Sequence, residues 1–484
     1  MKYNAYLYKK LSEYSLKNPN KDFIIDLDLK RNISYSRFKN SIDSLAIFFK
    51  DKDTILFTAD IGFYSSLLWI TCLSFGHRLI PISKDTPDDM INELIQFFNP
   101  SIFITDTSYT NKNIQIINNQ TLEKIINRQI INTITPKGGG SVCLTTSGST
   151  GKPKKILLSE NQIVNTAINV VDVHNSSEDD ICFNTLFFFH INAPVIALSS
   201  TLISGGIIVN SSKFSKSEFW NIIGKYNITW VNSVPTIINI LLDTDSNHPL
   251  ESLKFIRTGS APIPVKNITK FEEKFGIPII ETYGLSEAAS QIVANSINKR
   301  KIGSVGIPRG VDLIIVDQNN KDIIILKNEE KGEITIKGNS VISSYLEEVS
   351  KDSFVSGYFK TGDIGYIDAD GFVYITGRKK DIIICNGENI YPKEIEEVIL
   401  KHNQIKEVVV MGNPDKIKGE SITAFIVNNT TDFSINEFNK WLSSKIPLHT
   451  LPQKYILVKE IPKMKNYKID KVKLKEMISE HSRK

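Results

Sequence analysis

Between residues 144 and 155 the chain reads Leu144-Thr145-Thr146-Ser147-Gly148-Ser149-Thr150-Gly151-Lys152-Pro153-Lys154-Lys155. Its hydroxyl side chains can donate hydrogen bonds to phosphate oxygens, and its glycines permit tight turns that bring backbone N–H groups close to a phosphate. The stretch does not have the Gly-Lys-Ser/Thr ending of a Walker loop, so a nucleotide site of that type is excluded. A surface loop rich in serine and glycine has the same composition. This stretch alone therefore predicts either a phosphate-binding loop or a surface loop.

Short β-branched runs alternate with stretches of helical period on both sides of this loop. Before the loop, strands are expected at 54–57, 78–82 and 101–105, and helices at 64–75 and 88–98. After it, strands are expected at 207–209, 229–233 and 255–258, and helices at 217–226 and 236–242. Such alternation predicts parallel sheets flanked by helices.

The pattern changes near Gly303, where short strands separated by turns predict a small antiparallel unit at 312–316, 322–326 and 332–336. Past residues 377–381, a compact segment mixes strands at 407–411 and 421–427 with helices at 392–401 and 435–442. This segment predicts a separate domain. The expected fold class is α/β, with a large N-terminal domain of sheets flanked by helices and a small α+β C-terminal domain.

Composition limits the class of protein. A chain of 484 residues with 41% hydrophobic content can bury a sizeable core. The net charge of +5 comes from 58 basic and 53 acidic residues, an imbalance too small to indicate nucleic-acid or membrane binding. The four cysteines lie far apart, which argues against a disulfide framework or a zinc site and predicts buried, inert thiols in a reducing compartment: Cys72, Cys143, Cys182 and Cys385.

No apolar signal core is present near the N-terminus, so we expect a cytoplasmic protein. The most apolar region, 183–209, is interrupted by His190, Asn192, Pro194 and the Gly205-Gly206 pair. It is therefore too short to span hydrocarbon and predicts a buried helix and strand.

Two further motifs combine small residues with an aromatic ring. They read Arg257-Thr258-Gly259-Ser260-Ala261-Pro262 and Glu281-Thr282-Tyr283-Gly284-Leu285-Ser286-Glu287. Small residues let a flat ring approach the backbone, and an aromatic side chain can stack on that ring. The hydroxyl and the carboxylate that follow suit phosphate and Mg²⁺. For each motif in isolation, a turn rich in small residues with a solvated glutamate is the alternative.

A third pair of motifs suits a ribose. The chain reads Tyr358-Phe359-Lys360-Thr361-Gly362-Asp363, and Gly377-Arg378 ends a short hairpin that follows. An aspartate at a glycine turn can accept hydrogen bonds from both ribose hydroxyls, and an arginine on the next strand can donate to the sugar or to phosphate. An ordinary hairpin with a surface arginine is the alternative.

The last two motifs lie past the expected domain boundary. They read Cys385-Asn386-Gly387-Glu388-Asn389-Ile390-Tyr391-Pro392 and Pro462-Lys463-Met464-Lys465-Asn466-Tyr467-Lys468-Ile469-Asp470-Lys471. Residues 454–475 contain eight lysines against Glu460 and Asp470. A charge run of this kind is commonly a solvated face, so the tail alone does not predict a site.

Taken together and in this order, the motifs resemble the adenylate-forming superfamily, which contains acyl-CoA synthetases, peptide-synthetase adenylation domains and beetle luciferases. The resemblance covers nearly the whole chain, and its most specific parts are 146–154, 283–287, 361–363 and 377–378 with 387–390. It implies an ATP-dependent enzyme that activates a carboxylic acid as an acyl-adenylate, releases pyrophosphate and transfers the acyl group to a thiol.

The resemblance also implies residue roles. ATP and AMP are expected to bind at Thr146, Ser147, Gly148, Ser149, Thr150, Gly151, Lys154, Gly259, Ser260, Ala261, Thr282, Tyr283, Gly284, Ser286, Asp363 and Arg378. Tyr283 would stack on adenine, Asp363 and Arg378 would hold the ribose, and Glu287 would bind Mg²⁺. Lys468 would enter the site for adenylation. The large domain would span 1–378 and a small mobile domain 381–484, with a hinge near 379–380. Lys380 would be the hinge residue, and Gly387 would line the thiol channel after the small domain rotates.

The physical mechanism follows from the charges. A carboxylate that attacks the α-phosphate brings two anions together, so catalysis must come from positioning and charge neutralisation by Lys468, Mg²⁺ and the hydroxyl loop. This step needs no general base.

The acid is expected to be small or medium in size. Adenylation domains that select amino acids usually carry an aspartate where this chain has Phe189-His190-Ile191-Asn192-Ala193, so a free amino acid is disfavoured. The expected acyl pocket comprises His190, Ser233, Pro235, Thr258 and Gly284, and its surroundings are similar to oxalate-CoA ligases and in part to O-succinylbenzoate-CoA ligases. His190 is expected beside the acyl carboxylate; a buried histidine satisfied by hydrogen bonds is the alternative.

Coenzyme A is the first expected acceptor, and the phosphopantetheine of an acyl or peptidyl carrier protein in a secondary-metabolite pathway is the second, because a basic tail suits both. A degenerate nucleotide-binding protein is a third hypothesis. We expect a monomer or homodimer.

Three positions depart from the pattern of the superfamily. Tyr467 replaces the usual glycine before the tail lysine, which removes backbone freedom beside Lys468 and predicts slower adenylation. Lys155 replaces the glycine after the Pro-Lys pair and adds a charge near the expected pyrophosphate site. Ser286 replaces the commoner threonine and keeps the hydroxyl.

Overall fold

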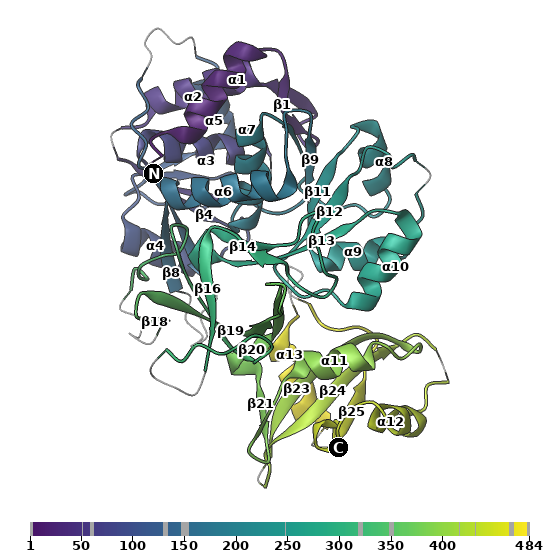
Figure 1. Ribbon diagram of the computed structural model, residues 1–484. Helices are drawn as coiled ribbons and strands as arrows, with labels where there is room; N and C mark the ends of the chain where they lie inside the picture. Colours follow the sequence, from purple (N-terminus) through teal and green to yellow (C-terminus); the bar gives the residue numbers. More distant parts are fainter. Residues whose placement is uncertain are drawn as a thin grey trace.

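The structure is a computed structural model that describes residues 3–50, 52–58, 62–128, 134–146, 154–246, 248–317, 323–347, 353–415, 417–430, 432–463 and 469–481. These residues form four sheets, three in a large N-terminal domain and one in a small C-terminal domain. The two domains lie one above the other in Figure 1. The predicted α/β fold class, with a large and a small domain, is confirmed.

The first sheet of the large domain has six strands in the order β6-β5-β3-β4-β7-β8. All neighbouring pairs are parallel except β7 and β8. Its strands are β3 (Thr54–Thr58), β4 (Arg78–Ile82), β5 (Ile102–Ile104), β6 (Gln115–Ile117), β7 (Ser141–Thr146) and β8 (Lys154–Ser159). The helices of this region are α1 (Tyr6–Lys17), α2 (Tyr35–Phe48), α3 (Phe63–Phe75), α4 (Asp88–Phe98) and α5 (Asn119–Ile126).

The second sheet has nine strands in the order β15-β14-β13-β12-β11-β9-β10-β1-β2. Its central strands are parallel, so their carboxyl ends meet at one edge. Its strands are β1 (Asp22–Asp26), β2 (Arg31–Ser34), β9 (Ile181–Asn184), β10 (Ile207–Asn210), β11 (Trp230–Ser233), β12 (Phe255–Thr258), β13 (Ile279–Leu285), β14 (Ser290–Ala294) and β15 (Ile307–Pro308). The associated helices are α6 (Glu160–His174), α8 (Phe219–Lys225), α9 (Pro235–Leu241) and α10 (Val265–Phe275).

The apolar region 183–209 forms the end of β9, a π-helix (Ala193–Ser199), α7 (Ser200–Ser204) and β10. The prediction of a buried helix and strand for this region is confirmed. The whole π-helix is buried. Within the described ranges, no helix has both the length and the apolar character needed to cross a membrane.

The third sheet is antiparallel and contains β16 (Val311–Val316), β17 (Gly332–Gly338), β18 (Phe354–Val355), β19 (Tyr358–Ile367) and β20 (Val373–Arg378). The predicted strand at 322–326 is wrong over its described residues, 323–326. Ile325 forms only an isolated bridge to Val316, and 62% of its surface is exposed. An apolar run without a continuous partner strand does not become a strand.

The small domain has its own sheet and core. Its elements are β21 (Ile383–Cys385), β22 (Glu388–Ile390), α11 (Pro392–Ile399), β23 (Ile405–Asp415), β24 (Gly419–Asn428), α12 (Ile435–Ser443), β25 (Lys454–Leu457) and α13 (Lys471–His481). Apolar side chains of β23 and β24 pack against α11 and α12 on one face of the sheet and, with Ile456 of β25, against α13 on the other.

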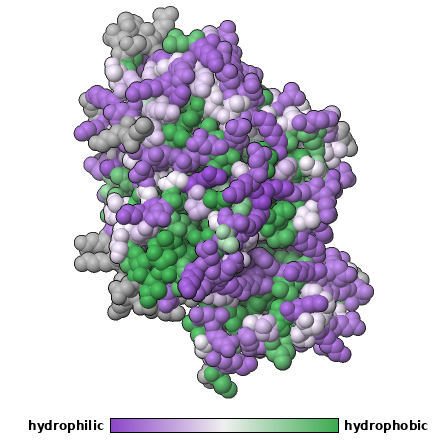
Figure 2. Space-filling model, in the orientation of Figure 1, coloured by the Kyte–Doolittle hydropathy of each residue, from purple (hydrophilic) through white to green (hydrophobic). Residues whose placement is uncertain are grey.

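The two domains meet through polar contacts. Lys266 of α10 donates to the carbonyls of Leu400 and His402 at 2.9 and 3.2 Å, and Lys393 of α11 donates to the carbonyl of Ile375 at 2.7 Å. Hydrophilic side chains lie along this boundary in Figure 2. A 3₁₀ turn (Lys379–Asp381) joins β20 to β21 and contains the predicted hinge residue Lys380. The exact domain limits stay a prediction.

The four cysteines are unpaired and buried, as predicted. Burial raises the pKa of the Cys143 thiol to about 12 and also raises the pKa of the Cys72 and Cys182 thiols. These three thiols are therefore unreactive at neutral pH.

Candidate active site

The predicted ribose-binding pair lies on neighbouring strands of the third sheet. β19 and β20 pair antiparallel with Asp363 opposite Arg378, and the Arg378 Nε lies 2.9 Å from the Asp363 Oδ1. The phenol of Tyr283, from the nine-stranded sheet, donates to the other carboxylate oxygen at 2.7 Å. Three predicted nucleotide-binding residues from two sheets therefore form one hydrogen-bonded group.

Burial sets the electrostatics of this group. Burial raises the pKa of the Asp363 carboxyl, although the Arg378 guanidinium and the Tyr283 hydroxyl counteract the shift. Burial and the adjacent Asp363 raise the pKa of Tyr283 well above its usual value, so the phenol stays protonated and donates. A buried acceptor beside an exposed guanidinium can bind both a hydroxyl and an anionic oxygen.

The small-residue motif begins at the carboxyl end of β12 and continues into an exposed strip. Ser260 and Ala261 are exposed, whereas Thr258 and Gly259 are buried. The Thr282 hydroxyl donates to the Thr258 carbonyl at 3.0 Å. A Cβ at Gly259 would come within 2.8 Å of the Thr282 Oγ1, so only glycine fits there. This flat strip beside Tyr283 leaves room for a planar ring to approach the backbone.

The predicted magnesium ligand Glu287 lies in a 3₁₀ turn (Ser286–Ala288) directly after β13. Its carboxylate accepts a hydrogen bond from the Tyr345 hydroxyl at 3.0 Å, and the ammonium of Lys154 lies 4.5 Å from the centre of the Tyr345 ring. Within the described residues, no group of three or more potential ligand side chains could hold a metal ion. A single carboxylate suits Mg²⁺ bound chiefly by substrate phosphates.

The predicted acyl-pocket residues lie near the carboxyl ends of β11, β12 and β13. Ser233 ends β11, Pro235 begins α9, and both are buried. His190 is exposed, with its ring 4.5 Å from that of Phe189, so the alternative of a buried histidine is wrong. The buried Thr258 hydroxyl has no hydrogen-bond partner in the described part of the chain.

The Lys155 departure has a structural partner. The Lys155 ammonium forms an ion pair with Glu347 at 2.8 Å, and its backbone N–H donates to the same carboxylate at 2.9 Å. It also lies 4.4 Å from the centre of the Phe97 ring. Its charge is thus neutralised within the protein.

Comparisons with known proteins assign the chain to a family. The family model described as AMP-binding enzyme matches residues 11–346, and the model described as AMP-binding enzyme C-terminal domain matches residues 394–468. The chain belongs to the AMP-binding enzymes.

Two curated AMP-binding relatives join small acids to coenzyme A. The chain is 33% identical to the sulfoacetate–CoA ligase of Cupriavidus necator over 69% of this chain and 66% of that protein. It is 32% identical to the oxalate–CoA ligase of Saccharomyces cerevisiae over 71% of this chain and 64% of that protein. The matches therefore span slightly less than two thirds of these relatives. The predicted resemblance to small-acid CoA ligases is confirmed.

A solved structure shows the same fold. The o-succinylbenzoate CoA synthetase of Bacillus subtilis, in complex with the acyl-adenylate intermediate OSB-AMP, superimposes with a TM-score of 0.82 at 26% identity. The similarity covers 96% of this chain and 97% of that chain.

Several predicted residues of this AMP-binding enzyme lie outside the described residues. They are Ser147, Gly148, Ser149, Thr150 and Gly151 of the loop, and Tyr467 and Lys468 of the tail. The backbone of Thr146 pairs with Lys154 where β7 meets β8. Lys463 and Ile469 form an isolated antiparallel bridge on either side of the tail segment.

The predicted thiol-channel residue Gly387 lies in a tight turn between β21 and β22. Asn386 and Gly387 both have positive φ, and the Asn386 N–H donates to the Lys418 carbonyl at 2.8 Å. The turn is exposed, and this hydrogen bond joins it to another residue of the small domain and not to the Tyr283–Asp363–Arg378 group. The Asn-Gly pair is a hairpin signal that the sequence analysis missed.

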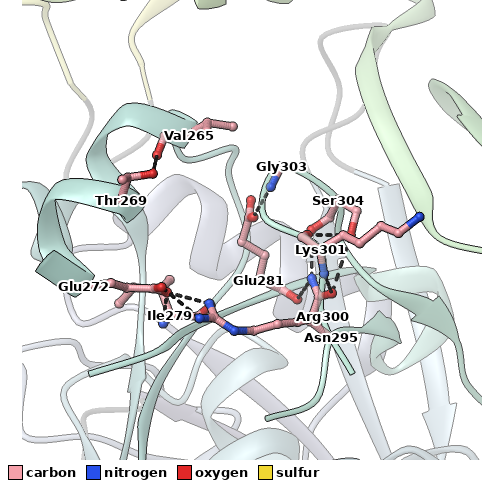
Figure 3. A network of polar contacts seen from close by, with 10 residues as sticks. All are labelled: Val265, Thr269, Glu272, Ile279, Glu281, Asn295, Arg300, Lys301, Gly303 and Ser304. Carbon is pink, nitrogen blue, oxygen red and sulfur yellow. Dashed lines mark hydrogen bonds and ion pairs between the residues drawn. The ribbon is translucent and has the colours of Figure 1, made fainter. Parts of the chain in front are cut away.

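Sequence reasoning also missed a polar network behind Tyr283. The buried Glu281 accepts from the Gly303 N–H at 3.0 Å, and Arg300 binds Glu272 at 2.5 and 2.8 Å. Figure 3 shows this network joining β13, α10 and the segment that contains Asn295 and Ser304. The signal that could have found it is a glutamate directly after the apolar Ile279-Ile280 run.

Proposed function

We propose that this chain is an ATP-dependent acid–thiol ligase that activates a carboxylic acid as an acyl-adenylate, releases pyrophosphate and transfers the acyl group to coenzyme A. The observation that carries the proposal is the Tyr283–Asp363–Arg378 group beside the exposed residues 260–261, in a chain of the AMP-binding family. The names of the curated relatives, ligases that join acids to coenzyme A, support it.

In the first step, a carboxylate oxygen attacks the α-phosphorus of ATP, and the bond to the pyrophosphate oxygen breaks. Asp363 and Arg378 fix the ribose while Tyr283 stacks on adenine, so the α-phosphate is held at a defined place. Lys468 and Lys154 neutralise charge on the phosphates. Glu287, together with the phosphates, would hold Mg²⁺, which would add further charge neutralisation there.

In the second step, a thiol attacks the acyl carbon, and AMP leaves with the bridging oxygen. We propose that the small domain rotates about Lys380 between the steps and brings the Gly387 turn to the thiol channel. The contacts between the domains are polar hydrogen bonds. They support a hinge, because polar interfaces between domains separate at a small cost in free energy.

The acid is proposed to be small, and His190 is proposed to lie beside its carboxylate. The π-helix after His190 is fully buried and Ser233 is buried, so little of this region is open for a long chain. The relatives act on sulfoacetate and oxalate, which are also small.

The test is acid-dependent exchange of pyrophosphate into ATP over a panel of acids, followed by addition of a thiol. At least one acid should support exchange, and coenzyme A should then yield the thioester. If thioester formed only on a phosphopantetheinyl carrier protein, that carrier protein would replace coenzyme A as the proposed acceptor. No exchange with any acid would contradict the ligase.

A variant separates the two steps. Lys468→Ala should abolish exchange yet form thioester from supplied acyl-adenylate at nearly the wild-type rate. Lys473→Ala, an exposed lysine of the same tail, is the matched control and should behave as wild type in both assays. Equal loss of both half-reactions in Lys468→Ala would refute the assigned role.

A further inference from the structure

Arg257 is a buried cation inside the nine-stranded sheet. Only 2% of its surface is exposed, and it follows two apolar residues in β12. Its Nε donates to the Gln291 side-chain oxygen and its Nη1 to the Asn232 side-chain oxygen, both at 3.2 Å. Among the residues that the structure describes, none supplies a carboxylate that pairs with this guanidinium. Its two observed partners are neutral amides.

An uncompensated buried charge is costly. Removing a guanidinium from water costs several kcal/mol unless an anion and a full set of hydrogen bonds replace the solvent. Burial lowers the pKa of Arg257 to about 9, which reflects the same cost. The neighbouring amides supply dipoles and no charge, so the sheet holds a cation whose counter-ion is not part of the described chain.

The amides around Arg257 form a connected layer. The Asn232 amide donates to the side-chain oxygens of Asn184 and Asn192, each at 3.1 Å. The Asn192 amide in turn donates to the Ser260 hydroxyl at 3.3 Å. A continuous polar path therefore joins the guanidinium to the exposed Ser260.

Arg257 is also adjacent to the proposed acyl pocket. A Cβ built at Gly259 would lie 3.0 Å from the Arg257 Nη2, so this nitrogen lies directly against the strip. Gln291 pairs with the pocket residue Gly284 across β13 and β14. One buried cation without a counter-ion among the described residues thus lies against Gly259 and, through Gln291, close to Gly284.

We propose that Arg257, with Asn192 and Asn232, forms an anion subsite that binds the second acidic group of a short dianionic acid. The ligand is a dicarboxylate or a sulfocarboxylate, because a carboxylate or sulfonate supplies the missing charge and accepts several hydrogen bonds. This inference rests on the proposed function and narrows its substrate class. Arg257 is then a specificity-determining residue, and the activated carboxylate lies outside this subsite.

The test compares each dianion with a neutral-ended isostere of the same size. Oxalate is matched with pyruvate, and malonate with acetoacetate; sulfoacetate is added as the sulfonate. In pyrophosphate exchange, the preferred dianion should exceed its isostere by at least about 100-fold in kcat/KM, because the isostere leaves the buried cation unpaired. Similar kcat/KM values for dianion and isostere would overturn the subsite and leave the ligase intact.

Substitutions then assign the effect to Arg257. Arg257→Met should lower kcat/KM for the dianion by at least about 100-fold and bring its ratio to the isostere within about threefold, and Arg257→Lys should restore part of the preference. Gln291→Glu keeps the arginine and pairs it internally, so it should also lower the use of the dianion and should fold even if Arg257→Met does not.

Calorimetric titration of oxalate and malonate gives a readout independent of turnover. Wild type should bind the preferred dianion in the presence of AMP, which cannot activate it, and Gln291→Glu should bind it at least tenfold more weakly. An unchanged dianion preference in Gln291→Glu and in a folded Arg257→Met would overturn the proposal. Absence of exchange with every acid, with the dianion still bound, would instead contradict the proposed ligase.

Discussion

Glu281 shows how a single residue behind the site couples stability to pH. It is 8% exposed, and its carboxylate accepts from the Gly303 N–H in the network of Figure 3. Burial raises its pKa from the ordinary 4.5 to about 7, despite that hydrogen bond. Between these two values the folded protein binds a proton that the unfolded chain releases. Its contribution to stability therefore falls as pH rises through this window.

Glu281→Gln should remove this dependence. The glutamine keeps an oxygen acceptor for Gly303 and cannot ionise. Relative to wild type, the variant should gain up to about 3 kcal/mol in free energy of unfolding between pH 4.5 and pH 8. Urea unfolding of both proteins at pH 5 and pH 8 measures the difference. If the free energy of unfolding changed equally in both proteins between pH 5 and pH 8, Glu281 would not be the cause of the pH dependence.

At the residue scale, sequence motifs identified the candidate nucleotide-binding residues but not the contacts between them. Tyr283, Asp363 and Arg378 were predicted at one nucleotide from their residue types and order, and the structure links them by hydrogen bonds. The pairing of Lys155 with Glu347 could not be predicted, because the two positions are 192 residues apart. Arg257 was quoted only as part of a motif, although a charge in a buried strand is itself a signal.

At the scale of elements, Lys266 connects a helix of the large domain to the end of a helix in the small domain. The carbonyls of Leu400 and His402 follow α11, where helix carbonyls have no intrahelical partner. The ammonium donates to both groups, and burial lowers the pKa of Lys266. This contact stabilises the domain arrangement seen in Figure 1.

Lys266→Met should weaken that arrangement by about 1.5 kcal/mol, the typical worth of a hydrogen bond to a charged group, or roughly tenfold in population. Distances between spin labels on cysteines introduced at Lys225 and Lys440 report the change, because the native thiols are buried. Lys270→Met, an exposed lysine of α10, is the control and should match wild type. An unchanged distance distribution in Lys266→Met would contradict this role.

Elements with strong local patterns were predicted well. The β-branched runs that became β3, β4, β10 and β12 were predicted within one residue at each end, because parallel strands buried on both faces are continuous apolar runs. The run at 322–326 has the same composition but no continuous partner, which composition does not reveal. The π-helix was expected only as a helix, since its hydrogen-bond register depends on its neighbours.

At the scale of the whole molecule, the sequence predicted a large and a small domain. The fold class could be predicted because alternation of strands and helices fixes the layers. The relative placement of the domains could not, because it depends on single polar contacts such as Lys393 with Ile375. These contacts leave no periodic signal in the sequence.

The most direct test of the central claim follows oxygen atoms through one turnover. The acid that best supports pyrophosphate exchange is labelled with ¹⁸O in its reacting carboxylate and converted with ATP and coenzyme A, and the products are analysed by mass spectrometry. If an acyl-adenylate forms, one labelled oxygen appears in AMP for each thioester made, and the pyrophosphate stays unlabelled. Labelled inorganic phosphate with ADP, or AMP without label, would contradict activation through an acyl-adenylate.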